Sequence, residues 1–147
     1  ADELLSMIVR QITNMADRPD RRFKVNSAFD DIRMVPDQAV PLALLVSEAL
    51  ANALKYATNG RDTSAELWVT LKRVDDSMVE LRIRNTTVRP IGEAEAMAPE
   101  RGGLGTQLIS AFAMQMGGTV EREAEDGFYN LMVLFELRPL SDAEQKI

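Results

Sequence analysis

A row of polar side chains lies along one face of a predicted helix near the middle of the chain. The segment from Ser47 to Ala57 is rich in Ala, Leu, Glu and Lys and contains neither Gly nor Pro, a composition that favours a helix. At about 3.6 residues per turn, Glu48, Asn52 and Lys55 share one ridge, because they follow an i, i+4, i+7 spacing. An acid, an amide and a base therefore stand in line, either as part of a chemical site or as an ordinary solvated helix face.

A glycine-rich segment follows in the second half of the chain. Arg101 to Ile109 contains Gly102, Gly103 and Gly105 at the point where a loop is predicted to become a helix over 104–116. The unpaired N–H groups and the positive dipole end of such a helix attract anions, above all phosphate. The segment is not a P-loop, because no Gly-Lys-Ser/Thr follows, and its glycine spacing is not that of a dinucleotide fingerprint. The alternative is a flexible helix entry without a ligand.

Composition limits the class of protein. The 147 residues, 46% hydrophobic and 27% charged, predict one soluble globular domain with a substantial core. A net charge of −6 argues against general nucleic-acid binding through a basic surface. The absence of Cys and His excludes disulfides, thiolate or imidazole metal sites and a serine triad with a histidine base within this chain. No apolar run in this sequence approaches membrane-spanning length, and no signal peptide is visible in it. Because the chain opens within a helical pattern, we expect it to be a fragment of a longer protein.

Hydrophobic periodicity predicts the elements that must position these motifs. Helices are expected over 2–16, 36–57 and 104–116, and strands over 22–29, 32–35, 65–74, 77–84, 119–125 and 129–137. A long loop over 86–103 is of the kind that forms functional lids or is disordered. The pattern predicts an α+β fold, a two-layer sandwich with a mixed, mostly antiparallel sheet and helices on one face.

The expected domain limits are 1–20 for a helix or linker, 21–140 for the main domain and 141–147 for a polar tail. The apolar side of the first helix either packs on this domain or continues a helix from an upstream one.

The order of the motifs resembles the GHKL ATPase fold, which histidine kinases, DNA gyrase B subunits and ninety-kilodalton heat-shock proteins share. The resemblance covers about residues 23–137. Residues 40–57 look like the N box of a sensor histidine kinase, and residues 104–118 look like its G2 box and the following helix. The sequence Gly-Thr-Gln-Leu-Ile and the Tyr56 that follows Lys55 are similar to the corresponding motifs of the HWE histidine kinases.

The resemblance implies that the domain binds ATP and Mg²⁺. Asn52 would coordinate the Mg²⁺ that bridges the ATP phosphates, Lys55 would offset phosphate charge, and Glu48 would orient the nucleophile or a metal-bound water. Residues 86–102 would form a lid, and the backbone N–H groups of 103–106 would face the phosphates. The nucleotide-binding residues implied in this way are Asn52, Lys55, Tyr56, Asn85, Arg101, Gly102, Gly103, Leu104, Gly105 and Thr106.

The chain departs from the family pattern at the strand before the lid. That strand usually ends in Asp-x-Gly-x-Gly, and its Asp accepts a hydrogen bond from the adenine amino group. Here Asn85 takes the Asp position and Thr87 that of the first glycine. A hydrogen bond to a charged acceptor contributes about 1.5–3 kcal/mol against about 1 for a neutral one, so ATP affinity can fall tenfold or more. The closing hairpin also has Phe128 where many relatives have a Thr that holds the adenine.

Two functions follow from the resemblance. The first is the cytoplasmic ATP-binding domain of a bacterial sensor histidine kinase, which phosphorylates a histidine on an upstream dimerisation domain. That histidine passes the phosphoryl group to a response regulator, and the full protein is expected to be a homodimer. This part of it would touch neither nucleic acid nor membrane. The second is a degenerate domain with weak or no ATP binding that acts as a scaffold or response-regulator-binding module. An anti-sigma-factor kinase of the same fold and an unrelated α+β domain are weaker alternatives.

Overall fold

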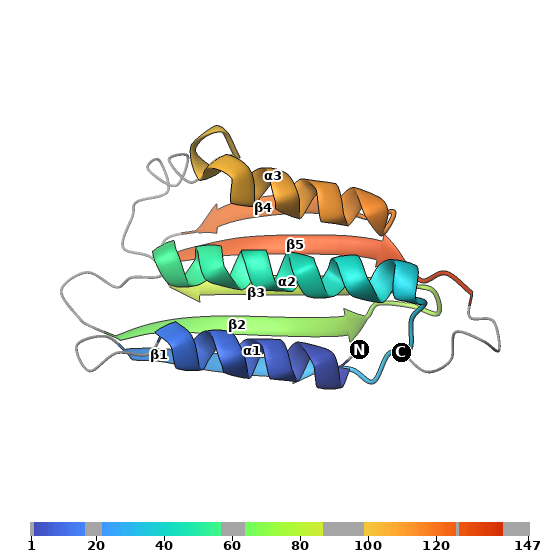
Figure 1. Cartoon of the computed structure of the whole chain (residues 1–147), viewed down its shortest axis with the longest axis horizontal. Helices are drawn as coiled ribbons and strands as arrows, with labels where there is room; N and C mark the ends of the chain where they lie inside the picture. The colour runs from blue at the N-terminus through green and yellow to red at the C-terminus, as the bar shows by residue number, and fades with distance from the viewer. Residues whose placement is uncertain (1, 17–21, 57–63, 87–98, 126, 140–147) are drawn as a thin grey trace.

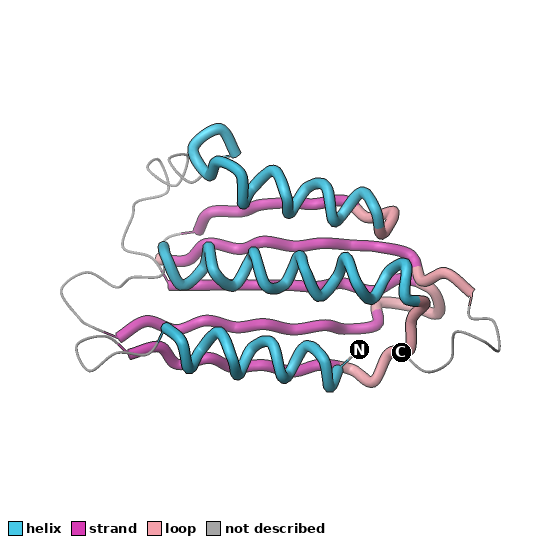
Figure 2. Tube along the Cα trace, in the orientation of Figure 1, coloured by secondary structure: helices cyan, strands magenta, loops and turns pink. Residues whose placement is uncertain are grey.

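Three helices lie side by side on one face of a five-stranded sheet in the computed structural model (Figure 1). The structure describes residues 2–16, 22–56, 64–86, 99–125 and 127–139. The helices are α1 (Asp2–Ala16), α2 (Pro36–Tyr56) and α3 (Pro99–Gln115). The strands are β1 (Arg22–Phe29), β2 (Ser64–Arg73), β3 (Met78–Thr86), β4 (Thr119–Glu125) and β5 (Phe128–Glu136). The predicted α+β sandwich with helices on one face is confirmed. In Figure 2 the helices (cyan) lie over the sheet and run along its strands (magenta).

The sheet is mixed, with the strand order β1-β2-β3-β5-β4. Strands β1 and β2 are parallel, and every other neighbouring pair is antiparallel. Parallel neighbours need a long crossover, which α2 provides between β1 and β2. The register places Asn85 opposite both Leu67 and Tyr129, so these three side chains share one face of the sheet.

The hydrophobic core fills the space between the sheet and the helices. On β3 the buried side chains Val79, Leu81 and Ile83 alternate with more exposed ones, as expected for a strand with one covered face. Helix α1 contributes Leu5 and Val9 to the same core. Of the two alternatives for the first helix, packing on this domain is therefore the one that the structure contains.

Hydrogen bonds fix the start of α2 and the end of α3. Gln38, fully buried in the first turn of α2, donates to the carbonyl oxygens of Met116 (3.2 Å) and Glu136 (2.7 Å) and accepts from the N–H of Arg138 (2.9 Å). Helix α3 ends at Gln115, and Gly117 in the turn that follows has a φ of 73°, which suits glycine. Its end is closed by a bond of 2.8 Å from the N–H of Gly118 to a carbonyl within α3.

One predicted strand is wrong. Residues 32–35 form no strand, although Ile32 and Met34 are fully buried while Arg33 between them is exposed. The apolar residues that predicted a strand are explained by burial without pairing: Ile32, Met34 and Val35 enter the core from a segment that belongs to no strand, just before α2 begins. Separately, no helix within the described ranges has both the length and the apolar composition needed to cross a bilayer.

Candidate functional site

The polar ridge of α2 meets the glycine-rich segment of α3. A Cβ placed on Gly105 would lie 3.1 Å from Oε2 of Glu48 and 3.4 Å from both amide atoms of Asn52. Glu48 and Asn52 are half-buried, so the ridge is not simply a solvated face. The two motifs singled out from the sequence therefore lie against each other, although half of the chain separates them.

A pocket of about 490 Å³, its open mouth included, lies beside this contact. It opens between α2, α3 and the part of the sheet formed by β3, β5 and β4. Polar and apolar side chains share its wall, and Glu48 lies outside the lining. The lining residues are Ala49, Asn52, Ala53, Ile83, Asn85, Thr106, Ile109, Arg122, Tyr129 and Leu131.

Asn85 presents a hydrogen-bond acceptor to the pocket. Its side chain is buried, with 2% of its surface exposed, and its amide Nδ2 donates to the carbonyl oxygen of Thr86 at 3.0 Å. A carbonyl oxygen can only accept, so this bond fixes the orientation of the amide and leaves Oδ1 free to accept. Asn85 thus offers the same kind of acceptor atom as a carboxylate at this position, without the charge.

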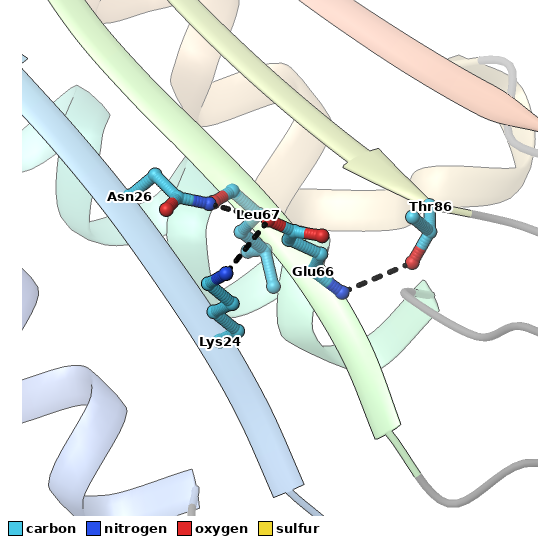
Figure 3. A network of polar contacts seen from close by, with 5 residues as sticks. All are labelled: Lys24, Asn26, Glu66, Leu67 and Thr86. Carbon is cyan, nitrogen blue, oxygen red and sulfur yellow. Dashed lines mark hydrogen bonds and ion pairs between the residues drawn. The ribbon is translucent and has the colours of Figure 1, made fainter.

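A network across three strands holds the end of β3 in place (Figure 3). The backbone N–H of Glu66 donates to Oγ1 of Thr86 at 3.1 Å. The carboxylate of Glu66 accepts from Nδ2 of Asn26 at 2.8 Å and lies 3.9 Å from the ammonium group of Lys24. Because Thr86 is anchored to β2, the carbonyl that orients the Asn85 amide has a fixed position.

Tyr129 and Arg122 also line the pocket. Tyr129 pairs with Asn85 across β3 and β5. Burial raises the pKa of the Tyr129 phenol, and the positive charge of Arg122 partly offsets that rise. The phenol therefore keeps its proton at neutral pH. Nη2 of Arg122 is buried and has no hydrogen-bond partner.

Neither of these two residues was singled out from the sequence. The signal for Arg122 is its position in β4: Val120, Arg122 and Ala124 share one face of the strand, and Glu121 and Glu123 occupy the other. An arginine between apolar residues on the covered face is notable, because charged side chains are seldom buried unless they have a partner. Tyr129 was assigned to a strand, but which face it would take depended on the pairing register.

The start of α3 differs from its prediction. The helix begins at Pro99 rather than Leu104, because proline suits the first helical turn. The glycines at 102, 103 and 105 therefore lie inside the helix, and the N–H groups left without helical acceptors are those of its first turn. The predicted presentation of the 103–106 N–H groups at a helix start is not the arrangement found. Thr106, only 5% exposed, nevertheless lines the pocket as a predicted site residue.

Several predicted site features lie outside the described part of the structure. These are the side chains of Lys55, Tyr56, Arg101 and Leu104 and the residues 87–98 of the expected lid.

Phe128 does not belong to the pocket, contrary to expectation. It pairs with Thr86, so it faces the side of the sheet opposite to Asn85 and Tyr129. There its ring lies 3.9 Å beneath the guanidinium of Arg84 and 5.9 Å from the Trp68 ring. The two departures from the family pattern therefore affect different faces of the sheet.

The donor set near Gly105 fits a magnesium ion that takes few protein ligands. No group of three or more acidic side chains within the described ranges gathers closely enough to hold a metal on its own. The oxygens of Asn52 and Glu48 are hard donors, and glycine at position 105 leaves the space between them without a side chain. Mg²⁺ commonly binds in this way, completing its shell with water and phosphate oxygens.

Comparison with known proteins identifies one family. Residues 37–139 match the family described as histidine kinase-, DNA gyrase B- and HSP90-like ATPase. This range includes all of α2 except Pro36, together with the residues that line the pocket and α3. A search of curated proteins finds no match.

Solved structures share the fold at low sequence identity. The chain is 20% identical to the histidine kinase domain of the Erythrobacter litoralis EL346 blue-light activated histidine kinase, with a TM-score of 0.76 over 91% of this chain and 61% of that one. For the EL346 kinase itself the values are 22%, 0.78, 90% and 40%. The mycobacterial sensor histidine kinase MprB gives 18% and 0.67, over 95% of this chain and 97% of that one. The chain thus spans 61% and 40% of the two Erythrobacter structures.

Proposed function

The chain belongs to the family of histidine kinase-, DNA gyrase B- and HSP90-like ATPases, and from this we propose that it is the ATP-binding catalytic domain of a bacterial sensor histidine kinase. The residues of the N box and the G2 box favour a histidine kinase close to the HWE group. The observation that carries the proposal is the contact of Gly105 with Glu48 and Asn52 beside the pocket. It brings an amide, a carboxylate and a glycine-rich helix to one place, as MgATP binding requires.

Each polar residue then has a separate task. Asn85 accepts a hydrogen bond from the adenine amino group through Oδ1, and Thr106 adds a hydroxyl to the pocket wall. Asn52 would hold Mg²⁺, and the ion would supply positive charge to the phosphates. Glu48 orients the incoming nucleophile from its place beside Gly105. Lys55 and Arg101 supply further positive charge, and Tyr56 follows Lys55 at the end of the N box.

Helix α3 has a composition that allows its start to open. Glycine in a helix interior is destabilising by about 1 kcal/mol relative to alanine, and three glycines lie in the first two turns of α3. Unwinding from Pro99 to Gly103 would release the N–H groups of 103–106 for the phosphates. We propose this as the form of α3 that binds nucleotide, with residues 86–102 as the lid.

The phosphoryl acceptor lies outside this chain. Because the sequence contains no His, the histidine must come from a dimerisation domain of the longer protein, which then serves a response regulator. Phosphoryl transfer depends mainly on positioning and charge neutralisation, so a nucleotide domain can act once that histidine is delivered. We propose a homodimer that works in the cytoplasm.

The proposal is tested by titrating ATP into the protein with and without Mg²⁺ and measuring the binding by calorimetry. Micromolar ATP binding that requires Mg²⁺ and disappears in Asn52→Asp would support it. Asn14→Asp is the matched control, because it makes the same change at an exposed position of α1, and it should retain binding.

A second candidate, a degenerate domain that serves as a scaffold, rests on the exchange of the family's Asp for Asn85. It predicts no binding at millimolar ATP, with Mg²⁺ present, in a protein that is folded. The acceptor atom retained by Asn85 is the reason to prefer the kinase.

A further inference from the structure

Among the described residues that line the pocket, Arg122 is the one with a charged side chain, and its Nη2 has no partner. It makes no ion pair with any residue within the described ranges. A buried N–H of a charged group without an acceptor is costly, and such groups normally find one. The chain therefore keeps at this position a donor that its own fold does not satisfy.

The surroundings of Arg122 indicate what kind of acceptor is missing. Arg122 pairs with Leu131 across β4 and β5, and its charge acts on Tyr129, which is directly opposite Asn85. Asn85 contributes an acceptor to the same pocket, because its Nδ2 donates to Thr86 and its Oδ1 stays free. An acceptor and a donor that flank one tyrosine match a ligand edge that carries an amino group next to a ring nitrogen.

Adenine has such an edge. Its N6 amino group donates, and N1 and N7 on either side of it accept. We propose that Arg122 is a specificity-determining residue, whose guanidinium turns its unpartnered Nη2 into the pocket when a ligand binds and donates to a ring nitrogen of adenine beside the amino group that Asn85 binds. This inference rests on the proposed ATP binding and adds a direct contact with the base from an edge strand.

A guanidinium also binds phosphate, so the test must separate base from phosphate. Binding of ATP, adenosine, 1-deaza-ATP and 7-deaza-ATP is measured for the wild type, Arg122→Met and the control Arg82→Met. Arg82 is exposed on the opposite face of the sheet, so its replacement is the same chemical change away from the pocket.

The expected result is a loss of about tenfold in affinity for both ATP and adenosine in Arg122→Met and none in Arg82→Met, as for a hydrogen bond from a charged donor. One of the two deaza analogues should bind the wild type about tenfold more weakly than ATP does. Arg122→Met should bind that analogue and ATP equally well, because the variant and the analogue each remove the same hydrogen bond. Arg122→Met should also melt at a higher temperature without ligand, because the unsatisfied buried N–H is gone.

Three results would overturn the inference. If both deaza analogues bind the wild type as ATP does, no ring nitrogen accepts from Arg122. If Arg122→Met weakens ATP but not adenosine, the acceptor is a phosphate oxygen. If a folded wild-type protein binds neither ATP nor adenosine, the proposed function fails together with the inference, whereas the first two results leave ATP binding intact.

Discussion

Gly105 on α3 lies so close to Glu48 on α2 that an added Cβ would come within 3.1 Å of the Glu48 carboxylate. The same Cβ would lie 3.4 Å from the amide of Asn52. The absence of a side chain at this one position lets two polar residues of the helix ridge reach the glycine-rich helix. The candidate site therefore depends on a helix-to-helix contact that no single segment of the chain contains.

Replacing this glycine separates stability from function. In Gly105→Ala, the flexible end of Glu48 can move aside by a few tenths of an ångström, and helix propensity gains up to about 1 kcal/mol. We expect the melting temperature to be unchanged or higher, while MgATP affinity falls because Glu48 and Asn52 are displaced. Calorimetric binding and thermal unfolding measure the two effects. Ser110→Ala, exposed on the same helix, should leave ATP affinity unchanged, and full ATP affinity in Gly105→Ala would contradict the proposed site.

Restoring the family's acid at position 85 should have opposite effects on affinity and stability. In Asn85→Asp an oxygen replaces the Nδ2 that donates to Thr86, so the ligand-free protein should lose about 1–3 kcal/mol of unfolding free energy. The charged acceptor should raise ATP affinity by about tenfold. Denaturant unfolding and titration of ATP give the two values. Asn85→Ala, which removes the acceptor, should weaken ATP, and a variant that binds ATP as well as the wild type would show that Oδ1 does not contact the base.

Phe128 should matter for stability and not for binding. It stacks on Arg84 on the face of the sheet away from the pocket. Phe128→Thr, which introduces the residue found in many relatives, is expected to cost about 1–2 kcal/mol of unfolding free energy through lost apolar and cation–π contact. ATP affinity should stay the same. The neighbouring change Tyr129→Thr, on the pocket face, should lower ATP affinity, and an equal effect of both changes would contradict the register.

Tyr129 should titrate above the ordinary tyrosine pKa of 10.0, because burial raises the pKa of its phenol. Tyr56→Phe leaves Tyr129 as the only tyrosine, so ultraviolet absorbance of tyrosinate reports it alone. Below pH 10 the phenol is protonated in both states; above it the unfolded chain loses its proton first, so stability falls as pH rises toward the folded pKa. Adding Arg122→Met removes the opposing charge and should raise the pKa of Tyr129 further. A pKa at or below 10 would place Tyr129 in solvent.

Gln38 should be important for folding and irrelevant to the nucleotide. Gln38→Leu leaves the carbonyls of Met116 and Glu136 and the N–H of Arg138 without the amide, at a cost of at least about 2 kcal/mol. The residue stands at the opposite end of α2 from Asn52, so ATP affinity of the folded variant should not change. Denaturant unfolding measures the loss. Gln115→Leu, at an exposed site, is the control, and equal stability of the two variants would mean that the network contributes nothing.

The elements with strong local periodicity could be predicted from the sequence. The bounds of α1 and β1 match their predicted ranges, and α2 and β2 differ from theirs by about one residue at either end. In each, the side-chain spacing reflects one buried face, which is a local property. The predictions of a strand over 32–35 and of a helix start at Leu104 were wrong. Residues 32–35 are buried without pairing to a strand, and α3 continues through glycines. Both features depend on the rest of the fold.

The sequence by itself determined the ridge of Glu48 and Asn52, the glycine-rich segment and the fold class, because helix period and residue type are properties of one stretch of chain. Only the tertiary structure decided that Gly105 would touch that ridge, that Asn85 would line the pocket beside Tyr129, and that Arg122, with an unsatisfied buried nitrogen, would line it too. Strand register sets which face each side chain takes, and a shift of one residue would exchange Tyr129 for Phe128. Register is fixed by pairing between segments distant in sequence, so no single stretch encodes it.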